Sequence, residues 1–408
     1  MKISLKDIEL KIFKYLWVFI LLPKELQFAL YIAILVYLVS KKGLKFDTFS
    51  KLVLMFILID FVAIFRQVIT GKPENSRLFA AFNTAAIWGV AIIFYCYFRE
   101  KTNSTKGYLH ILSKYAAVNF FILFLVWCVS LVISKNTISI GGLTYYLRRN
   151  DFLSTGTTTR FCGLMDTLLC PSHFYIIQMP IIFLDCVINN VKTKTFLLVG
   201  LIGIIPVIDT HSRAGLVICI LLYAMASFYL IKNRAHSKKV VQGIYLLSAI
   251  CLFAIAIVMI PEIKNFINGF INGRTGSNNT RLSIYINSIR TTWESSPIIG
   301  MGIKYMMGKY PLGSHSTYIG IFYKTGILGS VIFVLSFFNL YSKLYRNLIK
   351  LRCGRTIFAM LFCYLPFLIF ADLDATDWII VCFFSICGIL LNPHFNFSRV
   401  EDNINEIT

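Results

Sequence analysis

Long apolar runs separated by short polar segments follow one another along nearly the whole chain of 408 residues. A helix that crosses ~30 Å of hydrocarbon needs about 20 mostly apolar residues, or fewer when its end residues reach toward the interface. The pattern therefore predicts an all-α polytopic membrane protein with about 12 transmembrane helices, with residues 1–408 forming a single transmembrane helical domain. The expected spans are residues 10–22, 26–40, 52–69, 78–98, 112–134, 162–188, 195–208, 214–231, 240–260, 316–341, 357–371 and 378–391.

The positions of lysine and arginine give the orientation of these spans. With the N-terminus inside, each of six short cytoplasmic segments holds two to five such residues, as the positive-inside rule requires. The first two spans could instead form a re-entrant hairpin around Pro23, but counting them as one span would invert the pattern for every later loop. We therefore expect a multi-pass protein of the bacterial inner membrane with both termini in the cytoplasm. The six segments are residues 1–14, 41–51, 99–111, 189–194, 232–239 and 342–356.

Two of the predicted outside loops are long, residues 135–161 and residues 261–315. In the longer one, Leu282, Ile286, Ile289 and Trp293 recur at helical spacing. This spacing predicts an amphipathic helix that lies on the extracytoplasmic membrane surface.

Composition agrees with a membrane protein. The chain is 57% hydrophobic and 14% charged, against roughly 25% charged residues in soluble domains. A net charge of +21 would suggest a nucleic-acid partner in a soluble protein, but here it reflects topology, and we expect no nucleic acid. Most of the eleven cysteines lie in apolar runs, where cysteine behaves as a small hydrophobe. Their spacing indicates neither a metal site nor a redox motif.

Four cationic or ionisable residues fall near the predicted outer boundary, where the positive-inside rule favours few cations. They are Arg160, Arg213, Arg281 and His315. Helix N-termini on that side favour an anion, and a guanidinium can bond two oxygens at once. The arrangement predicts a cradle for a diphosphate. The alternative is that these arginines only reach toward lipid headgroups.

Two histidines lie in polar turns that lead into apolar helices. Ser314 or Ser316 is expected to cap the helix after His315, whose positive end should keep the imidazole neutral and able to accept a proton. His315 could instead only hydrogen-bond its loop. His211, in "DTHSRAGL", could be a second base or a substrate contact, although a local role in the turn is favoured.

Several outer aspartates have candidate partners. Asp166 could orient Arg160. Asp372, Asp374 and Asp377 in the last outside loop could pair with the outer arginines or bind a cation, or they could simply be solvated.

Three segments in order along the chain, "DTHSRAGL", "TRLSIYINSIRTTWESSPIIGMGIKY" and "GSHSTYIGIFYKTGILG", resemble the superfamily of O-antigen ligases and Wzy-type polysaccharide polymerases. The resemblance covers roughly residues 160–330. The residues that carry it are Ser212, Arg213, Arg281, Trp293, Pro297, Gly300, Gly302, His315, Ser316, Gly326 and Gly329.

The resemblance implies a GT-C-like, metal-independent, inverting glycosyltransferase without a cofactor. Its donor would be a glycan on undecaprenyl diphosphate at the outer leaflet, its acceptor another glycan, and a chain-length regulator could be a partner. By the same resemblance Arg160 and Arg213 would bind the diphosphate, with Arg213 also acting in catalysis. Arg281 would hold the donor or the loop, and His315 would activate the acceptor hydroxyl. Apart from the resemblance, His211 is a further candidate for contacting substrate.

Three functions remain open at this point. Ser316 stands where many ligases have Asn, so we favour a polymerase of O-antigen or capsule repeat units. The first alternative is a ligase that passes a finished glycan to lipid A-core or another acceptor. The second, from another class, is a transporter or flippase of lipid-linked glycan, although the sequence lacks the paired broken spans of such proteins.

Overall fold

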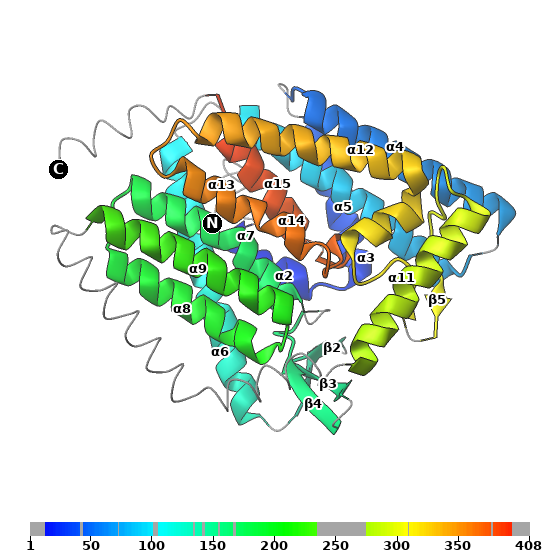
Figure 1. Ribbon diagram of the computed structural model, residues 1–408, viewed down its shortest axis with the longest axis horizontal. Coiled ribbons are helices and arrows are strands. Elements are labelled where there is room, and N and C mark those ends of the chain that lie inside the picture. The colour runs from blue at the N-terminus through cyan, green and yellow to red at the C-terminus, as the bar shows by residue number, and fades with distance from the viewer. Residues whose placement is uncertain are drawn as a thin grey trace.

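The computed structural model is a helical bundle with three small β-hairpins (Figure 1). It describes residues 13–40, 44–71, 73–100, 105–133, 135–140, 143–153, 156–165, 169–234, 275–308, 310–376 and 378–393. The helices are α2 (Leu16–Leu21), α3 (Lys24–Ser40), α4 (Thr48–Thr70), α5 (Asn75–Glu100), α6 (Thr105–Val132), α7 (Cys170–Ile188), α8 (Thr193–Asp209), α9 (Arg213–Arg234), α11 (Thr275–Ser295), α12 (Thr317–Leu348), α13 (Gly354–Phe362), α14 (Tyr364–Phe367), the 3₁₀ helix η1 (Leu373–Thr376) and α15 (Trp378–Leu390). The strands are β1 (Thr137–Ile140), β2 (Leu143–Tyr146), β3 (Arg148–Leu153), β4 (Gly156–Phe161), β5 (Met306–Met307) and β6 (Tyr310–Pro311).

Six helices in the described part of the chain are long and apolar enough to cross a membrane: α4, α5, α6, α7, α9 and α12. Shorter apolar helices follow at residues 354–367 and 378–390. The protein is therefore a multi-pass membrane protein, as the apolar runs predict. The expected count of about twelve spans is not reached in these ranges, because α2 has only six residues and α3 and α8 have 17 each. The span predicted at residues 240–260 lies outside the described residues.

The bundle has a buried centre and a perimeter that faces outward. In α7, 89% of the apolar stretch is buried, against 28% in α6 and in α9, and every residue of α15 is buried. Helix α15 packs on α5 and α12 packs on α4, while α7 contacts α6, α8 and α9 (Figure 1). On the perimeter, apolar side chains such as Leu58 and Phe65 are more than half exposed, as expected for residues that face lipid.

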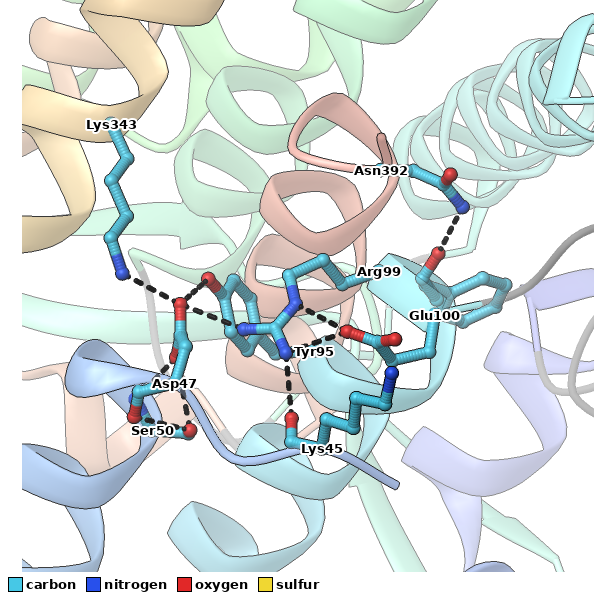
Figure 2. A network of polar contacts seen from close by, with 9 residues as sticks. Lys45, Asp47, Ser50, Tyr95, Arg99, Glu100, Lys343 and Asn392 are labelled. Carbon is cyan, nitrogen blue, oxygen red and sulfur yellow. Dashed lines mark hydrogen bonds and ion pairs between the residues drawn. The ribbon is translucent and has the colours of Figure 1, made fainter. Parts of the chain in front are cut away.

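A charge network at the end of the bundle predicted to be cytoplasmic joins the start of α4 to the ends of α5 and α12 (Figure 2). Asp47 caps α4 by accepting a bond from the Ser50 amide at 2.9 Å. The Asp47 carboxylate also pairs with Arg99 at 2.7 Å and Lys343 at 2.8 Å, and it accepts the Tyr95 hydroxyl. Burial alone would raise the pKa of Asp47, but the Lys343 and Ser50 bonds and the Arg99 charge outweigh it, and the pKa falls to about 2.

The segment at residues 135–161, predicted to be a long outside loop, contains regular structure that the sequence reading did not anticipate. It forms two antiparallel hairpins, β1 with β2 and β3 with β4, and Arg149 lies opposite Arg160 in the second pair. The strands hold threonine, tyrosine and isoleucine, which favour β-structure, and a Gly-Gly pair, residues 141 and 142, separates the first two. That pattern typically marks a hairpin.

Helix α7 begins at Cys170, later than the start predicted at residue 162. Gly163 and Leu164 have φ values of 69° and 64°, in the left-handed region that a right-handed helix cannot contain. Pro171 lies in the first turn of α7, where the missing N–H of proline costs nothing. The apolar residues 162–165 therefore lie in a turn that precedes the helix.

Candidate active site

Helix α12 is broken at Gly326, whose φ of 61° is left-handed. Inside a membrane protein the backbone polar groups freed at such a break need partners from the protein itself. The loop at residues 297–302, which carries the "PIIGMG" motif, supplies them. Two loop amides donate to carbonyls of α12, Met301 to Tyr323 (2.7 Å) and Gly302 to Lys324 (2.8 Å). Two amides of α12 donate to loop carbonyls, Ile327 to Pro297 (2.8 Å) and Leu328 to Ile298 (3.0 Å).

This loop fits only with glycine at two positions. A Cβ on Gly300 would lie 2.3 Å from the carbonyl oxygen of Lys324, and one on Gly302 would lie 2.5 Å from the backbone of α4. Both residues also have left-handed φ values. Arg66 of α4 donates to the carbonyl of Ser295 at 3.0 Å and so fixes the end of α11 beside the loop. The motif glycines therefore shape the segment that leads to His315.

Three arginines from separate segments line one cavity of about 420 Å³. Arg160 comes from β4, Arg213 is the first residue of α9, and Arg281 lies on α11. Among the described residues, the lining contains no acidic side chain. The lining therefore combines three cationic side chains with several apolar ones. Its other lining residues are Leu169, Ser212, Ala214, Val217, Ile218, Pro366 and Phe370.

The turn before α9 positions Arg160 and Arg213. Arg160 is 6% exposed, and its Nε donates to the Thr210 carbonyl at 2.7 Å. The Ser212 hydroxyl accepts a bond from the Gly215 amide at 3.3 Å and so caps the helix that Arg213 begins. An anion in the cavity would thus face two guanidinium groups and the positive end of α9.

His211 lies in the same turn but is not among the residues that line the cavity. Its φ is 51°, its side chain is 51% exposed, and its Nε2 is 3.8 Å from an Asp209 oxygen. Asp209 also forms an ion pair with Arg148 and accepts the Trp127 indole N–H at 3.0 Å. This geometry fits a role of His211 in the turn, and the substrate contact remains a hypothesis.

His315 is held in the loop before α12 with a left-handed φ of 68°. Its carbonyl accepts the Tyr285 hydroxyl at 2.9 Å, and its ring centroid is 5.3 Å from that of Tyr310. Burial and the positive charges of Arg281 and Lys304 lower the pKa of His315 to about 4. His315 does not line the arginine cavity. Arg281 does line it, and its charge also lowers the pKa of His315.

The start of α12 is not capped by serine, contrary to expectation. Ser316 occupies the N-cap position without a side-chain cap bond, and the buried Ser314 hydroxyl has no hydrogen-bond partner among the described residues. Instead the Thr317 amide donates to the carbonyls of Leu368 at 3.0 Å and Ala371 at 2.8 Å. The segment after α14 therefore anchors the helix that follows His315.

Asp372 and Asp374 pair with lysines rather than with the arginines that line the cavity. Lys304 Nζ lies 2.7 Å from Asp372, and Lys324 Nζ lies 2.7 Å from Asp374. Both lysines were absent from the sequence-based candidate site. Two more aspartates with proposed roles lie outside the described residues: Asp166 and Asp377.

Sequence reasoning missed Tyr285, although a signal was present. Tyr285 follows Arg281 by four residues, and residues at this spacing share one face of a helix. The structure confirms the predicted helix as α11, with the Leu282, Ile286, Ile289 and Trp293 side chains 42–63% exposed. The opposite face, with Ile284, Ser288 and Thr292 buried, packs on the protein.

Comparison with known proteins bears on this site. A family model described as O-antigen ligase matches residues 198–334, a range that contains Arg213, Arg281 and His315 but not Arg160. No curated protein and no solved structure shows a significant match to the chain. The match to residues 198–334 agrees with the superfamily that the motifs of this segment resemble.

Proposed function

We propose that the protein polymerises undecaprenyl-diphosphate-linked oligosaccharide repeat units into surface polysaccharide on the extracytoplasmic face of the membrane. The match of residues 198–334 to the O-antigen ligase family supports glycosyl transfer of the ligase or polymerase type in general. The observation that carries the proposal is the cavity that Arg160, Arg213 and Arg281 line together with apolar side chains.

A lipid-linked diphosphate has the two properties that this cavity can satisfy. Its phosphate oxygens suit guanidinium groups, which donate two parallel hydrogen bonds, and no carboxylate in the described lining competes for them. Its polyprenyl chain suits the apolar side chains of the lining, among which Val217 and Phe370 expose hydrophobic surface. A snorkelling arginine at a membrane surface would not need a second and third arginine in the same cavity.

The proposed reaction is one displacement. The acceptor hydroxyl oxygen attacks the anomeric carbon of the donor, the bond from that carbon to the diphosphate oxygen breaks, and its electron pair leaves with the diphosphate. The hydroxyl proton passes to the imidazole of His315. Negative charge gathers on the leaving group in the transition state, where fixed guanidinium groups stabilise it most effectively. A single displacement inverts the anomeric configuration.

His315 suits this role because it is neutral at neutral pH. The pKa of about 4 makes it a weak base in the empty protein. A bound diphosphate beside Arg281 would offset the charge of that arginine, which is one cause of the low pKa. The basicity of His315 should therefore rise when the donor is bound, which suits a general base.

The description of the matching family favours a second function, the O-antigen ligase. It uses the same chemistry and the same residues, so the cavity alone does not separate the two. A transporter is less well supported. Broken helices occur in transporters, but the backbone groups freed at the break of α12 are bonded by the chain's own loop.

Glycan analysis in a strain that lacks this chain separates these functions. A polymerase predicts loss of long chains while single repeat units still reach the final acceptor. A ligase predicts long chains that remain on the lipid diphosphate. Normal chain length on the normal acceptor would contradict both. Repeat units trapped on the cytoplasmic side would instead indicate a flippase.

A further inference from the structure

A second polar cavity, of about 160 Å³, lies beside the start of α12. It is several times larger than the ~30 Å³ that one water takes in the liquid, so it can hold a ligand of several heavy atoms. Among the described residues it shares no lining residue with the arginine cavity. Its charged lining residues are Arg77, Lys304, Lys324, Asp372 and Asp374.

Four of these charges form two joined ion pairs. Besides the pairs at 2.7 Å described above, Lys304 lies 3.5 Å from Asp374, and Asp374 accepts the Trp88 indole N–H at 3.2 Å. Ionisable groups at membrane depth are costly and mark functional sites. The side chain of Lys324 is only 3% exposed. At such a buried position an apolar side chain would be more favourable for folding than a charged one.

Some polar groups of the cluster have no partner among the described residues. Asp60, 2% exposed and 3.7 Å from Lys324, has one carboxylate oxygen without a hydrogen-bond partner among the described residues. Arg77 is half-buried in the wall, and it forms no ion pair with any described residue. The lining carries three cations and two carboxylates, and Asp60 beside Lys324 brings the cluster to three of each. Arg77 is thus the cation of the lining that an added anion could pair with.

The cavity is tied to His315 through the first residue of α12. The Thr317 hydroxyl donates to the Ala371 carbonyl at 2.7 Å and accepts the Leu373 amide at 2.9 Å. Asp372 sits between these two bonded residues. The charge of Lys304 also acts on His315. A ligand among these side chains would lie close to the imidazole without entering the arginine cavity.

We propose that this cavity binds the sugar of the acceptor glycan that presents the attacking hydroxyl, and that the sugar or its neighbour bears an anionic group held by Arg77. The proposal rests on the proposed function. Lysine donates and carboxylate accepts, so adjacent Lys–Asp pairs can bond a sugar hydroxyl on both its proton and its oxygen. A few fixed polar groups of this kind set orientation in ligand pockets. Arg77, which pairs with none of the described carboxylates, can bond a carboxylate of the ligand through two N–H groups.

The test uses full-length protein in lipid nanodiscs and two substrates. The donor is the native lipid-linked repeat unit. The acceptor probe is the repeat-unit oligosaccharide released from its lipid diphosphate, which can enter as acceptor only. Initial rates are measured against acceptor concentration for wild type, Arg77→Gln, Asp372→Asn and Arg213→Lys. Arg290→Gln, on the exposed part of α11, is the matched arginine control.

We expect Arg77→Gln to raise the KM for the acceptor probe at least about tenfold with kcat nearly unchanged, and Arg290→Gln to leave both constants as in wild type. Arg213→Lys should lower kcat without changing the acceptor KM. Asp372→Asn should also raise the acceptor KM. This variant breaks the ion pair with Lys304 and could fail to fold, in which case Arg77→Gln, which breaks no ion pair among the described residues, still gives the test. If the wild-type protein transfers glycan and Arg77→Gln has an unchanged acceptor KM, this inference is overturned and the proposed function stands. No transfer by wild-type protein from the lipid-linked donor would overturn the proposed function and this inference with it.

Discussion

The hydroxyl of Tyr285 on α11 donates a hydrogen bond to the backbone carbonyl of His315, with 2.9 Å between the two oxygens. His315 has a φ of 68°, a conformation that non-glycine residues seldom adopt without support. Helix α11, which also carries Arg281, thus helps to fix the backbone of the proposed base. Helix α11 is therefore a part of the candidate site.

Tyr285→Phe should slow glycosyl transfer about two- to tenfold. Only one hydrogen bond is lost, and such a bond contributes ~0.5–1.5 kcal/mol. Because Tyr285 positions His315 and does not contact substrate, we expect a lower kcat with little change in donor affinity. Tyr341→Phe is the matched control, since the Tyr341 hydroxyl bonds the Leu361 carbonyl at the same distance. Equal loss of rate in both variants would mean that Tyr285 acts only through stability.

Arg281→Ala should weaken donor binding and lower the rate at least about tenfold, because it removes one of the three guanidinium groups in the cavity. Arg290→Ala serves as the control, as it lies on the same helix, is exposed and does not line the cavity. Binding of the lipid-linked donor to protein in nanodiscs measures the effect. Similar donor affinity in the two variants would exclude Arg281 from the diphosphate site.

The fall of kcat/KM at acid pH should reflect protonation of His315. As the pH falls through about 4, the imidazole gains a proton and can no longer act as a base, so kcat/KM should fall there and not near 6.5. Arg281→Gln removes one of the charges that lower the pKa of His315, so its acid limb should move upward. Tryptophan fluorescence at each pH checks that the protein remains folded. An acid limb that stays in place in Arg281→Gln would show that the limb belongs to another group.

Gly300→Ala should destabilise the protein more than Gly308→Ala. Both glycines have left-handed φ values, so both substitutions carry strain of ~1–2 kcal/mol. At Gly300 the new Cβ would also meet the Lys324 carbonyl at 2.3 Å, whereas nothing lies within 4 Å at Gly308. Overpacking adds ~1–3 kcal/mol. Thermal unfolding in detergent should show a clearly larger drop in Tm for Gly300→Ala, and equal drops would mean that the loop is not held tightly in the break of α12.

Apolar runs were sufficient to predict the helices that dominate the fold. The run at 52–69 became α4 (Thr48–Thr70), and the run at 378–391 became α15 (Trp378–Leu390), because a long apolar segment in lipid has to satisfy its backbone internally as a helix. The break of α12 could not be predicted in this way. Gly326 lies within an apolar run, and its left-handed conformation depends on a loop that precedes it by more than twenty residues.

The gathering of Arg160, Arg213 and Arg281 was predicted from topology, since all three fall at the same predicted membrane boundary. Sequence did not predict the side chains that contact His315 or the second cavity. The pairs Lys304–Asp372 and Lys324–Asp374 join residues at least fifty positions apart, and only the packing of α12 against the segment after α14 brings them together. Nor did the sequence reading recognise the threonine-rich hairpin that positions Arg160.

The variant His315→Asn tests the central claim most directly. Asparagine tolerates a left-handed φ and keeps a polar side chain, but it cannot accept the proton. In a strain that lacks the native chain, the variant should reach the membrane at the wild-type level and leave the lipid-linked repeat units unpolymerised, with a rate lowered at least about a hundredfold. Full-length polysaccharide formed at the normal rate by this variant would contradict the account.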